Sequence, residues 1–546
     1  MKKTISVLAI LTILMSVQSL GQSSCFPEKQ YIPHSLPDYT SYRDSLPSPV
    51  FDEKPLWVET YWKAWELAFR NFNEPAPGSG FVSQFADAAF NECIFLWDMS
   101  FITMFCNYAH PMVPGISGLN NFYAKQYPDG EFSREIIRKT GVNRWPVSDT
   151  GRTLYSEWGW GVPGKKEVTY IGREVPQPNP VMTLDALNHP IAAWAEWESY
   201  RMTGDKARLE LIWKPLEKYF QSLKKYLTQG NGLYMTDWAS MDNSERNPYL
   251  VGGGTGIDIS AEMVLFANNL ADIFGELGNK EKEKIYLKEA SELAEKINRL
   301  MWDPDRKFYF DLTLRGERAP VKTIAAFWPL LANVASKQQS ADLVTHLTNP
   351  SEFWRKNLVP TLAADQKEFS SSGDYWCGAV WAPTNTMIIR GLENYGYDSL
   401  ARVIALNHVT LVADMFRKTG TIWENYAPDS LSCGYISGKR QVMRDFVGWS
   451  GIGPILYFME YAIGIKADGV KKELSWSVNS NQKSGCKRYR FGGIVTSLVA
   501  EPVDQHTMKI KVESNGNYTL ILKNKVSGEF KIKAGVQEFR VTRVAI

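Results

Sequence analysis

The sequence is poor in the residues that bind transition metals or build disulfide frameworks. Its 546 residues include six cysteines and six scattered histidines, and neither CxxC nor HExxH occurs. Six cysteines in a chain of this length do not form a disulfide framework. We therefore expect no His/Cys metal site and no cofactor, while a Ca²⁺ ion in the long loops stays an open alternative. We expect Cys93 and Cys106 to be buried free thiols rather than a pair.

An excess of charge of one sign is also missing. The formal net charge is +2, from 61 basic and 59 acidic residues. Lys2 and Lys3 lie in a segment that we expect to be removed, and without them 59 basic residues balance 59 acidic ones. A balanced charge argues against nucleic acid or an anionic membrane surface as the partner.

Only the N-terminus has an apolar run of note. Residues 1–21 have the form of a secretory signal, with Lys2-Lys3 first, then an apolar stretch, then Ser19-Leu20-Gly21 before a cleavage site. The run is too short for a membrane span, so we expect an exported protein that is periplasmic or secreted. Cys25 would allow a lipid anchor, but Gln22-Ser23-Ser24-Cys25 lacks the usual Leu, so this alternative is less favoured.

Aromatic residues, in contrast, are abundant, with 19 Trp, 25 Tyr and 26 Phe. Many of them will lie in the core, because a hydrophobic content of 44% is that of an ordinary globular protein. The same enrichment suits carbohydrate recognition, since aromatic faces cover the apolar side of a pyranose. The fold class therefore has to be inferred from the spacing of apolar residues along the sequence.

Apolar residues repeat at three and four positions over most of residues 55–466, which predicts a mainly α domain. Loops within successive helix pairs are short and loops between pairs are long. This alternation favours an (α/α)6 toroid of helical hairpins whose long loops gather at one face, and no short repeat indicates a solenoid. The predicted helices are residues 56–69, 87–108, 115–126, 189–202, 205–227, 257–277, 280–301, 323–335, 340–347, 380–395, 397–417 and 446–463.

Two further regions flank this domain. Residues 22–54 are rich in Pro, Ser, Asp and Tyr and are predicted to be an extended arm that wraps the body. Residues 467–546 contain short alternating β-rich stretches separated by Gly, Asn and Asp, which predict a small antiparallel sandwich-like β domain. Within the helical domain, residues 145–180 show little periodicity, and a loop of that length is expected to form one wall of a site.

Three stretches carry carboxylates beside aromatic residues. Residues 238–248 form a polar loop in which Asp242 follows Trp238, and Glu424 lies between Trp423 and Tyr426 in a turn-forming segment. Asp98 stands in an otherwise apolar run and needs a partner or an opening to a cleft. The structural alternatives are a solvated loop for residues 238–248 and a helix N-cap for Asp98; we favour a sugar-hydroxyl ligand at a pocket floor for Asp98.

Five motifs stand in order along the chain. They are Trp97-Asp98, Asp129-Gly130 with Arg134-Glu135-Ile136, Asp242-Asn243-Ser244 with Arg246, Tyr375 to Trp381 (compare YWRGPVW), and Glu424-Asn425-Tyr426. With these motifs the chain resembles the (α/α)6-barrel glycoside hydrolases of the trehalase, glucosidase I and mannosylglycerate hydrolase group, and most closely the mannosylglycerate-hydrolase-like branch. The likeness covers residues 55–465.

The resemblance implies a hydrolase that cleaves glycosidic bonds with inversion, acting on a short, α-linked glucoside or mannoside. It assigns Asp242 as the general acid and Glu424 as the general base, and an apolar wall such as Trp238 would favour the protonated form of Asp242. Candidates for sugar stacking are Trp97, Trp376, Trp381, Trp423 and Trp449, each of which could instead be core. Candidates for hydroxyl contacts are Asp98, Arg134, Asn243, Arg246 and Asn385.

The chain departs from the family pattern at several positions. Cys377 and Ala379 replace the Arg and Pro of YWRGPVW, and Trp238-Ala239-Ser240 replaces Glu-Ser-Gly, so the identity of the sugar cannot be carried over. A polysaccharide lyase or sugar epimerase on the same toroid is a rival, but the histidines lack the spacing such mechanisms use. A glycan-binding protein without activity is the other rival, although both carboxylates are present. The oligomeric state cannot be predicted.

Overall fold

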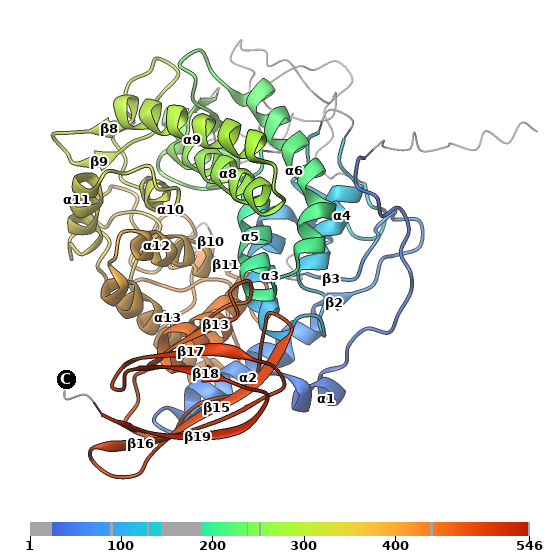
Figure 1. Cartoon of the computed structure of the whole chain (residues 1–546). Coiled ribbons are helices and arrows are strands. Elements are labelled where there is room, and N and C mark those ends of the chain that lie inside the picture. Colours follow the sequence, from blue (N-terminus) through green and yellow to red (C-terminus); the bar gives the residue numbers. More distant parts are fainter. Residues whose placement is uncertain are drawn as a thin grey trace, which may run out of the picture.

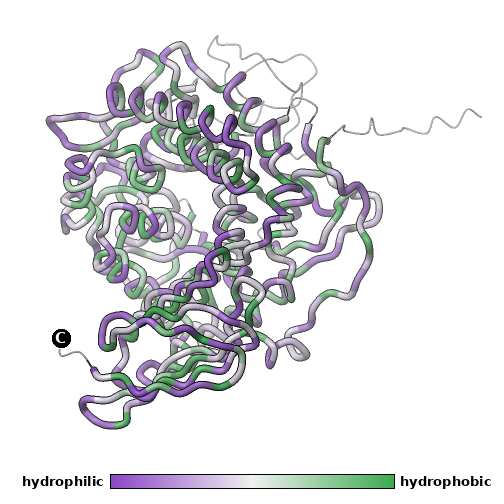
Figure 2. Tube along the Cα trace, in the orientation of Figure 1, coloured by the Kyte–Doolittle hydropathy of each residue, from purple (hydrophilic) through white to green (hydrophobic). Residues whose placement is uncertain are grey.

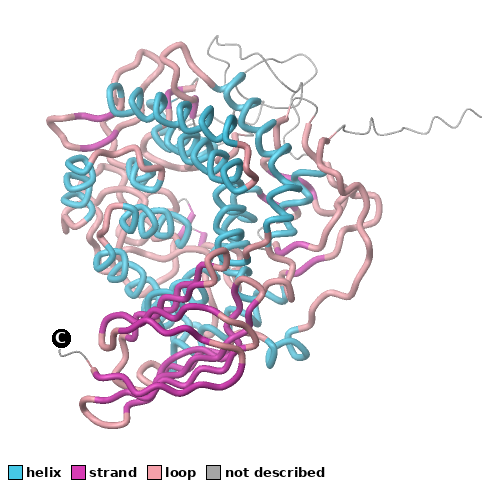
Figure 3. The backbone as a smooth tube through the Cα atoms, in the orientation of Figure 1, coloured by secondary structure: helices cyan, strands magenta, loops and turns pink. Residues whose placement is uncertain are grey.

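The computed structural model describes residues 24–87, 91–127, 130–142, 187–236, 238–250, 253–436 and 440–543. Figure 1 shows a large helical domain with a β domain packed against one side, and Figure 3 shows that strands dominate only in the second. The predicted signal segment, the long loop 145–180 and Asp129 lie outside the described residues.

The helical domain begins at α2, where Pro55 occupies the first turn and Arg70 the last. Local signals set several other boundaries: the Asp205 side chain caps the start of α6, and Gly204, at a left-handed φ of +69°, ends α5. The helices are α1 (Tyr39–Tyr42), α2 (Pro55–Arg70), α3 (Leu96–Cys106), α4 (Asn120–Ala124), α5 (Ala192–Thr203), α6 (Lys206–Leu227), α7 (Asn247–Leu250), α8 (Ile257–Glu276), α9 (Lys280–Leu300), α10 (Trp328–Leu331), α11 (Lys337–Leu347), α12 (Ala382–Asn394) and α13 (Asp398–Thr419). Shorter turns are η1 (Arg43–Ser45), η2 (Asn107–Ala109), η3 (Ile116–Leu119), η5 (Trp238–Ser240), η6 (Ile324–Phe327) and η7 (Trp449–Ile452), followed by a π-helix, η8 (Gly453–Ile463).

These helices form a closed ring of contacts. In order, α3, α5, α8, α10, α12 and η7 each contact the next, and η7 contacts α3 again. A second set packs on this ring: α9 on α8, α6 on α5 and α8, and α13 on α12 and η8. Figure 2 shows apolar stretches concentrated toward the interior of this arrangement, in keeping with the buried core residues of the same helices.

Each of the twelve predicted helical stretches contains helical turns, but two differ in extent. Residues 93–95 form a strand, β4, rather than the start of a helix, because they pair with β5. The stretch predicted at 323–335 is reduced to η6 and α10, with Pro329 at the start of α10. The short strands of the helical domain are β2 (Phe72–Asn73), β3 (Phe85–Ala86), β4 (Cys93–Phe95), β5 (Glu135–Ile137), β6 (Met235–Thr236), β7 (Gly254–Thr255), β8 (Trp302–Asp303), β9 (Phe308–Tyr309), β10 (Tyr435–Ile436) and β11 (Arg440–Gln441).

The β domain consists of two sheets whose alternating residues are buried. One sheet has the order β1-β14-β15-β16-β19 and the other β12-β13-β17-β18. Its strands are β1 (Ser48–Phe51), β12 (Ile465–Asp468), β13 (Glu473–Val478), β14 (Ser484–Phe491), β15 (Ile494–Pro502), β16 (Thr507–Ser514), β17 (Tyr518–Asn524), β18 (Gly528–Ile532) and β19 (Gly535–Thr542).

Two expectations for this domain need correction. The domain is not purely antiparallel, because β13 pairs with β17 in parallel, from Glu473 opposite Thr519 to Val478 opposite Asn524. The predicted arm also does more than wrap the body, since its strand β1 is the edge of the five-stranded sheet, with Ser48 opposite Lys487. The first β-domain strand starts at Ile465, directly after Gly464 ends η8 with a φ of +92°.

One helix among the described residues, α13, is long and apolar enough to span a membrane by composition. It packs on α2, α12 and η8, and half of its most apolar stretch is buried inside the protein, as in a core helix. All six cysteines are free, and Cys93 and Cys106 are buried, which confirms the prediction of free thiols.

Candidate active site

A cavity of about 450 Å³ opens among the loops that join the helices. Short hairpins border it, because residues of β4, β5, β10 and β11 are among its walls. Its aromatic lining comprises Phe95, Trp97, Trp238, Tyr375, Trp376, Trp381 and Trp449. Its charged and polar lining includes Asn91, Asp98, Arg134, Glu135, Asn188, His189, Ser240, Asp242, Asn243 and Arg440.

The loop that follows β6 presents Asp242 to the cavity. It opens with the turn η5, and the Asn247 amide donates to the carbonyl oxygens of Met241 and Asp242 at 2.9 Å each, which holds the loop closed. The Asp242 side chain is 41% exposed because it faces the cavity, and its Oδ1 lies 3.7 Å from Arg134 Nη2. Burial by the surrounding protein raises the pKa of Asp242, and Arg134 opposes that rise.

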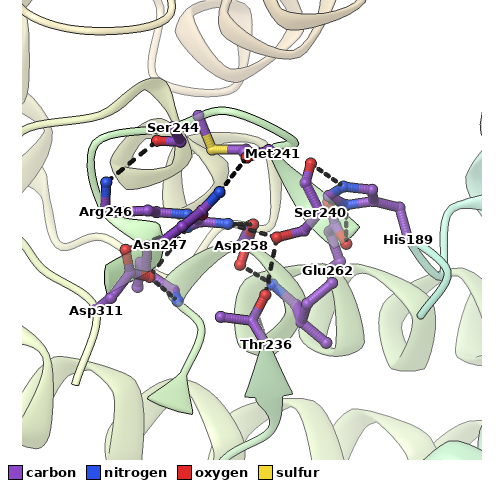
Figure 4. A network of polar contacts seen from close by, with 12 residues as sticks. His189, Thr236, Ser240, Met241, Ser244, Arg246, Asn247, Asp258, Glu262 and Asp311 are labelled. Carbon is purple, nitrogen blue, oxygen red and sulfur yellow. Dashed lines mark hydrogen bonds and ion pairs between the residues drawn. The ribbon is translucent and has the colours of Figure 1, made fainter. Parts of the chain in front are cut away.

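Arg246 lies beneath this loop and does not line the cavity, so its predicted contact with substrate is wrong. Arg246 is fully buried, and Figure 4 shows its side chain between Asp258 and Asp311. Its Nη2 lies 2.5 Å from Asp258 and its Nη1 lies 3.2 Å from Asp311. Nη2 also donates to Ser240 Oγ at 2.6 Å. A buried charge needs such partners, and here the partners fix the loop to α8.

Glu424 is 1% exposed and is not itself among the lining residues. Its carboxylate accepts a hydrogen bond from the hydroxyl of Tyr375, which does line the cavity, and another from the Met443 backbone N–H, both at 3.0 Å. Burial raises the pKa of Glu424 to about 7, although both hydrogen bonds favour the charged form. Asp242 raises it further, so the two carboxylates are within electrostatic reach of each other.

Asp98 is the third carboxylate of the site. It lies in the first turn of α3, 7% exposed, and the N-cap position belongs to Phe95, so the N-cap alternative does not apply. Its pKa is raised well above the usual range, first by burial and then by Asp87 and Glu424. A neutral carboxylic acid that faces the cavity can donate as well as accept a hydrogen bond.

Four of the five tryptophans proposed for stacking line the cavity, as does Trp238. Trp376 and Trp381 stack with ring centroids 4.7 Å apart and an interplanar angle of 19°, and Trp449 lies 5.5 Å from Trp381. Trp423 does not line the cavity; its Nε1 donates to Thr419 Oγ1 at 3.1 Å, so the prediction of sugar stacking is wrong for this residue.

The two asparagines proposed for hydroxyl contacts have structural partners. Asn243 lines the cavity, but its amide donates to the Asp374 carbonyl oxygen and accepts from the Trp376 N–H, which fixes the neighbouring turn. Asn385 is 1% exposed, bonds to His408 and does not line the cavity, so its predicted role is wrong.

Cys377, which replaces the arginine of the family pattern, also points elsewhere. Its thiol donates to the Asn243 carbonyl oxygen at 3.0 Å and packs in a small apolar cluster with Val321 and Leu362. Burial raises its pKa to about 12. The substitution therefore changes the packing behind the cavity rather than its lining.

Sequence reasoning gave no role to several residues of the site, among them Tyr375, Arg440 and His189. Tyr375 stands inside a motif that drew attention but was given no role, and Arg440 lies on a hairpin without any motif. His189 was set aside because the histidines lack a recognisable spacing, yet it lines the cavity and bonds to residues 51 and 73 positions away. No local pattern signals contacts of that range. The described residues contain no group of three or more His, Cys, Asp or Glu side chains placed to hold a metal ion.

Comparison with known proteins agrees with the motifs. The Mannosylglycerate hydrolase MGH1-like glycoside hydrolase domain matches residues 164–441, just over half of the chain. The chain belongs to this glycoside hydrolase family. A relative from Borreliella burgdorferi, an uncharacterized protein, is 27% identical over 371 residues, which cover 65% of this chain and 77% of the relative.

Solved structures share the fold at low sequence identity. The GH63 mannosylglycerate hydrolase from Thermus thermophilus, in complex with glucose, aligns with a TM-score of 0.53 at 18% identity, over 72% of this chain and 98% of that one. The alpha-L-rhamnosidase from Dictyoglumus thermophilum aligns with a TM-score of 0.59 at 12% identity, over 91% of this chain and 51% of that one. These likenesses are evidence of fold, a helical domain with a β domain, and family membership rests on the sequence match.

Proposed function

We propose that this family member is an exported, inverting glycoside hydrolase on an (α/α)6 toroid, and that it cleaves a short, α-linked glucoside or mannoside. One observation carries the proposal: Asp242 lines a tryptophan-rich cavity, and Glu424, 182 positions further along the sequence, is buried behind it, bonded to the cavity-lining Tyr375 and near enough for Asp242 to raise its pKa. Export rests on residues 1–21 of the sequence.

In this mechanism Asp242 is the general acid and Glu424 the general base. An inverting enzyme needs a protonated carboxylic acid at the glycosidic oxygen and an opposing carboxylate that activates water. The protein that surrounds Asp242 favours its protonated form. The Asp242 side chain opens to the cavity, so it can reach a bound glycoside. The hydrogen bonds from Tyr375 and Met443 favour the charged form of Glu424 that a base requires.

The lining of the cavity supports a small sugar substrate. A volume of about 450 Å³ is toward the lower end of the 300 to 1,000 Å³ typical of small-molecule sites, which suits one or two sugar units. The stacked pair Trp376 and Trp381 offers an apolar platform for a pyranose ring. Asp98 is placed to bind sugar hydroxyls from the floor of the same cavity.

The test uses purified mature protein and a panel of α-linked gluco- and manno-oligosaccharides, followed by proton NMR. Initial release of the β-anomer is expected, because inversion at an α-linkage gives that product. Initial release of the α-anomer would contradict the two-carboxylate mechanism. No turnover across the panel, together with binding on a glycan array, would favour a binding protein instead.

Two substitutions test the carboxylates themselves. Asp242→Asn and Glu424→Gln should each reduce kcat by about 100-fold to 10,000-fold, the usual contribution of a general acid or base. Asp272→Asn is the matched control, because burial raises the pKa of Asp272 to about 6 although it lies on α8 and does not line the cavity. The assignment fails if either active-site variant keeps most of its activity while its circular dichroism matches that of the wild type.

A further inference from the structure

One buried ionisable pair beside the cavity has no part in the mechanism above. The His189 ring forms part of the cavity wall, and its centroid lies 4.3 Å from that of Trp97. On its other side, Nε2 lies 3.0 Å from the carbonyl oxygen of Ser240, two residues before Asp242. A carbonyl oxygen only accepts hydrogen bonds, so Nε2 must carry a proton.

The second ring nitrogen faces a carboxylate. Nδ1 of His189 lies 2.7 Å and 2.9 Å from the two oxygens of Glu262, a residue of α8 that is fully buried. Figure 4 shows this pair beside the Arg246 cluster, under the same loop. Burial raises the pKa of Glu262, and His189 opposes that rise. With Glu262 ionised, its oxygens only accept, both ring nitrogens of His189 carry protons and the ring is an imidazolium.

The surrounding charges are consistent with that state. Burial is the largest influence on His189 and opposes its charge, but Glu262, Asp258 and the Ser240 carbonyl together outweigh burial and raise the pKa of His189. Arg246 lies on the far side of Glu262 and Asp258 and is paired with Asp258 and Asp311. The charge of His189 also acts on Asp242, where it lowers the pKa, and Asp98 and Glu135 line the same cavity.

We propose that His189, charged through its pairing with Glu262, is a positioning residue that holds the Asp242 loop against the Trp97 wall and keeps a positive charge beside Asp242. Its role as a positioning residue for the acid rests on the proposed function. It touches neither the glycosidic oxygen nor the water; it acts through the Ser240 carbonyl and through its charge.

The proposal has two consequences for catalysis. Without the bond to Ser240, the loop loses one of its anchors, and the acid should be misplaced in the transition state. Without the positive charge, the pKa of Asp242 should rise, because burial and the charge of Glu135, which both raise it, would then be opposed by Arg134. Since the acid must be protonated, a higher pKa moves the alkaline limb of the kcat/KM profile to higher pH.

The first experiment needs no substrate. Nitrogen-15 NMR of the histidine side chains in the full mature chain, titrated with pH, should show His189 as an imidazolium at pH 7, with its signals assigned by their loss in His189→Gln. In Glu262→Gln, His189 should lose its proton at a lower pH than in the wild type, because its counter-charge is gone. Neutral imidazole signals for wild-type His189 at pH 7 would overturn the proposal whether or not the protein is a hydrolase.

The second experiment measures kcat and KM against pH on the substrate that the panel identifies. His189→Gln and Glu262→Gln should each lower kcat about 10-fold to 100-fold, with little change in KM, and move the alkaline limb upward. The matched control is His346→Gln, because His346 makes the same kind of pair, 2.6 Å from Glu352 and 2.9 Å from the Arg306 carbonyl oxygen, away from the cavity. An unmoved limb in both active-site variants, or an equal shift in the control, would contradict the charge role.

Discussion

At the scale of single residues, the partners of Glu424 decide how it can act. The carboxylate receives one hydrogen bond from the Tyr375 hydroxyl and one from the Met443 N–H. Both bonds stabilise the ionised form, and they partly offset the burial that raises the pKa of Glu424 to about 7. A base must be ionised to act, so activity should fall as the pH drops through about 7.

Removal of the Tyr375 hydroxyl should move that acidic limb. In Tyr375→Phe the carboxylate keeps one hydrogen bond, its charged form is less stabilised, and the pKa of Glu424 rises. The acidic limb of the kcat/KM profile should shift upward by about one to two pH units, since a hydrogen bond to a charged group contributes about 1.5 to 3 kcal/mol and one pKa unit corresponds to about 1.4 kcal/mol.

Tyr309→Phe is the control for this shift, because Tyr309 is also buried and bonded to a side chain, Asn298, but does not line the cavity. Residue 375 has a left-handed φ of +53°, and phenylalanine and tyrosine adopt this conformation at the same cost. The backbone strain is therefore the same in the variant and in the wild type. A limb that stays in place would mean that Tyr375 does not influence the base.

The sequence proposed Asp242 and Glu424 as acid and base through their resemblance to the family motifs, and these roles stay predictions. Their supporting residues gave no such signal. The contacts of Tyr375 with Glu424 and of His189 with Ser240 join residues 49 and 51 positions apart, and they depend on side-chain directions that no local pattern encodes. The same limit explains why Asn385 and Trp423 were wrongly placed in the site.

At the scale of elements, the loop between β6 and α7 is held from below as well as from the cavity side. Arg246 joins it to Asp258 on α8 and to Asp311, which also accepts from the Ile257 N–H at the start of α8. The sequence analysis predicted that Arg246 contacts the sugar, because a guanidinium beside Asn and Ser is typical both of a sugar contact and of a buried anchor. The ion pairs with Asp258 and Asp311, which are distant in sequence, make Arg246 a buried anchor.

Arg246→Met should therefore damage stability more than substrate binding. The substitution leaves Asp258 and Asp311 buried without their counter-charge, and loss of one partner from a buried ion pair costs about 3 to 5 kcal/mol. Urea unfolding should show this loss in the free energy of unfolding. Arg201→Met is the control, since Arg201 is 54% exposed and lies 4.0 Å from Asp468. Unchanged stability with a raised KM would instead place Arg246 in contact with substrate.

At the scale of the whole molecule, periodicity was enough for the helices but not for the sheets. Helical contacts repeat every three or four residues, so all twelve helical stretches could be located from the sequence. Strand pairing is set by partners far along the chain, and β1 joins β14 across more than 430 residues. The place of β1 at the edge of the sheet and the parallel pairing of β13 with β17 were missed for this reason.

The β domain shares its core with the helical domain. The buried residues of both form one continuous cluster, and Trp476, fully buried in β13, donates from Nε1 to the carbonyl oxygen of Ile463 at the end of η8. Tyr489 of β14 packs against Tyr108, whose hydroxyl donates to Glu460 of η8. The strand β1 also lies just ahead of α2 in the chain, so the first helix is tied to the sheet.

These contacts predict that the helical domain does not fold without the β domain. Deletion of residues 465–546 would expose apolar residues of η8 and leave β1 without a partner, and such surface drives aggregation. Expression of the truncated chain should give insoluble protein, while calorimetry of the full mature chain should show one cooperative unfolding transition. A soluble, active truncated chain, or two separate unfolding transitions, would contradict this prediction and show that the β domain is an independent unit. The role of the sheets would then be to contact substrate or partners rather than to stabilise the helical domain.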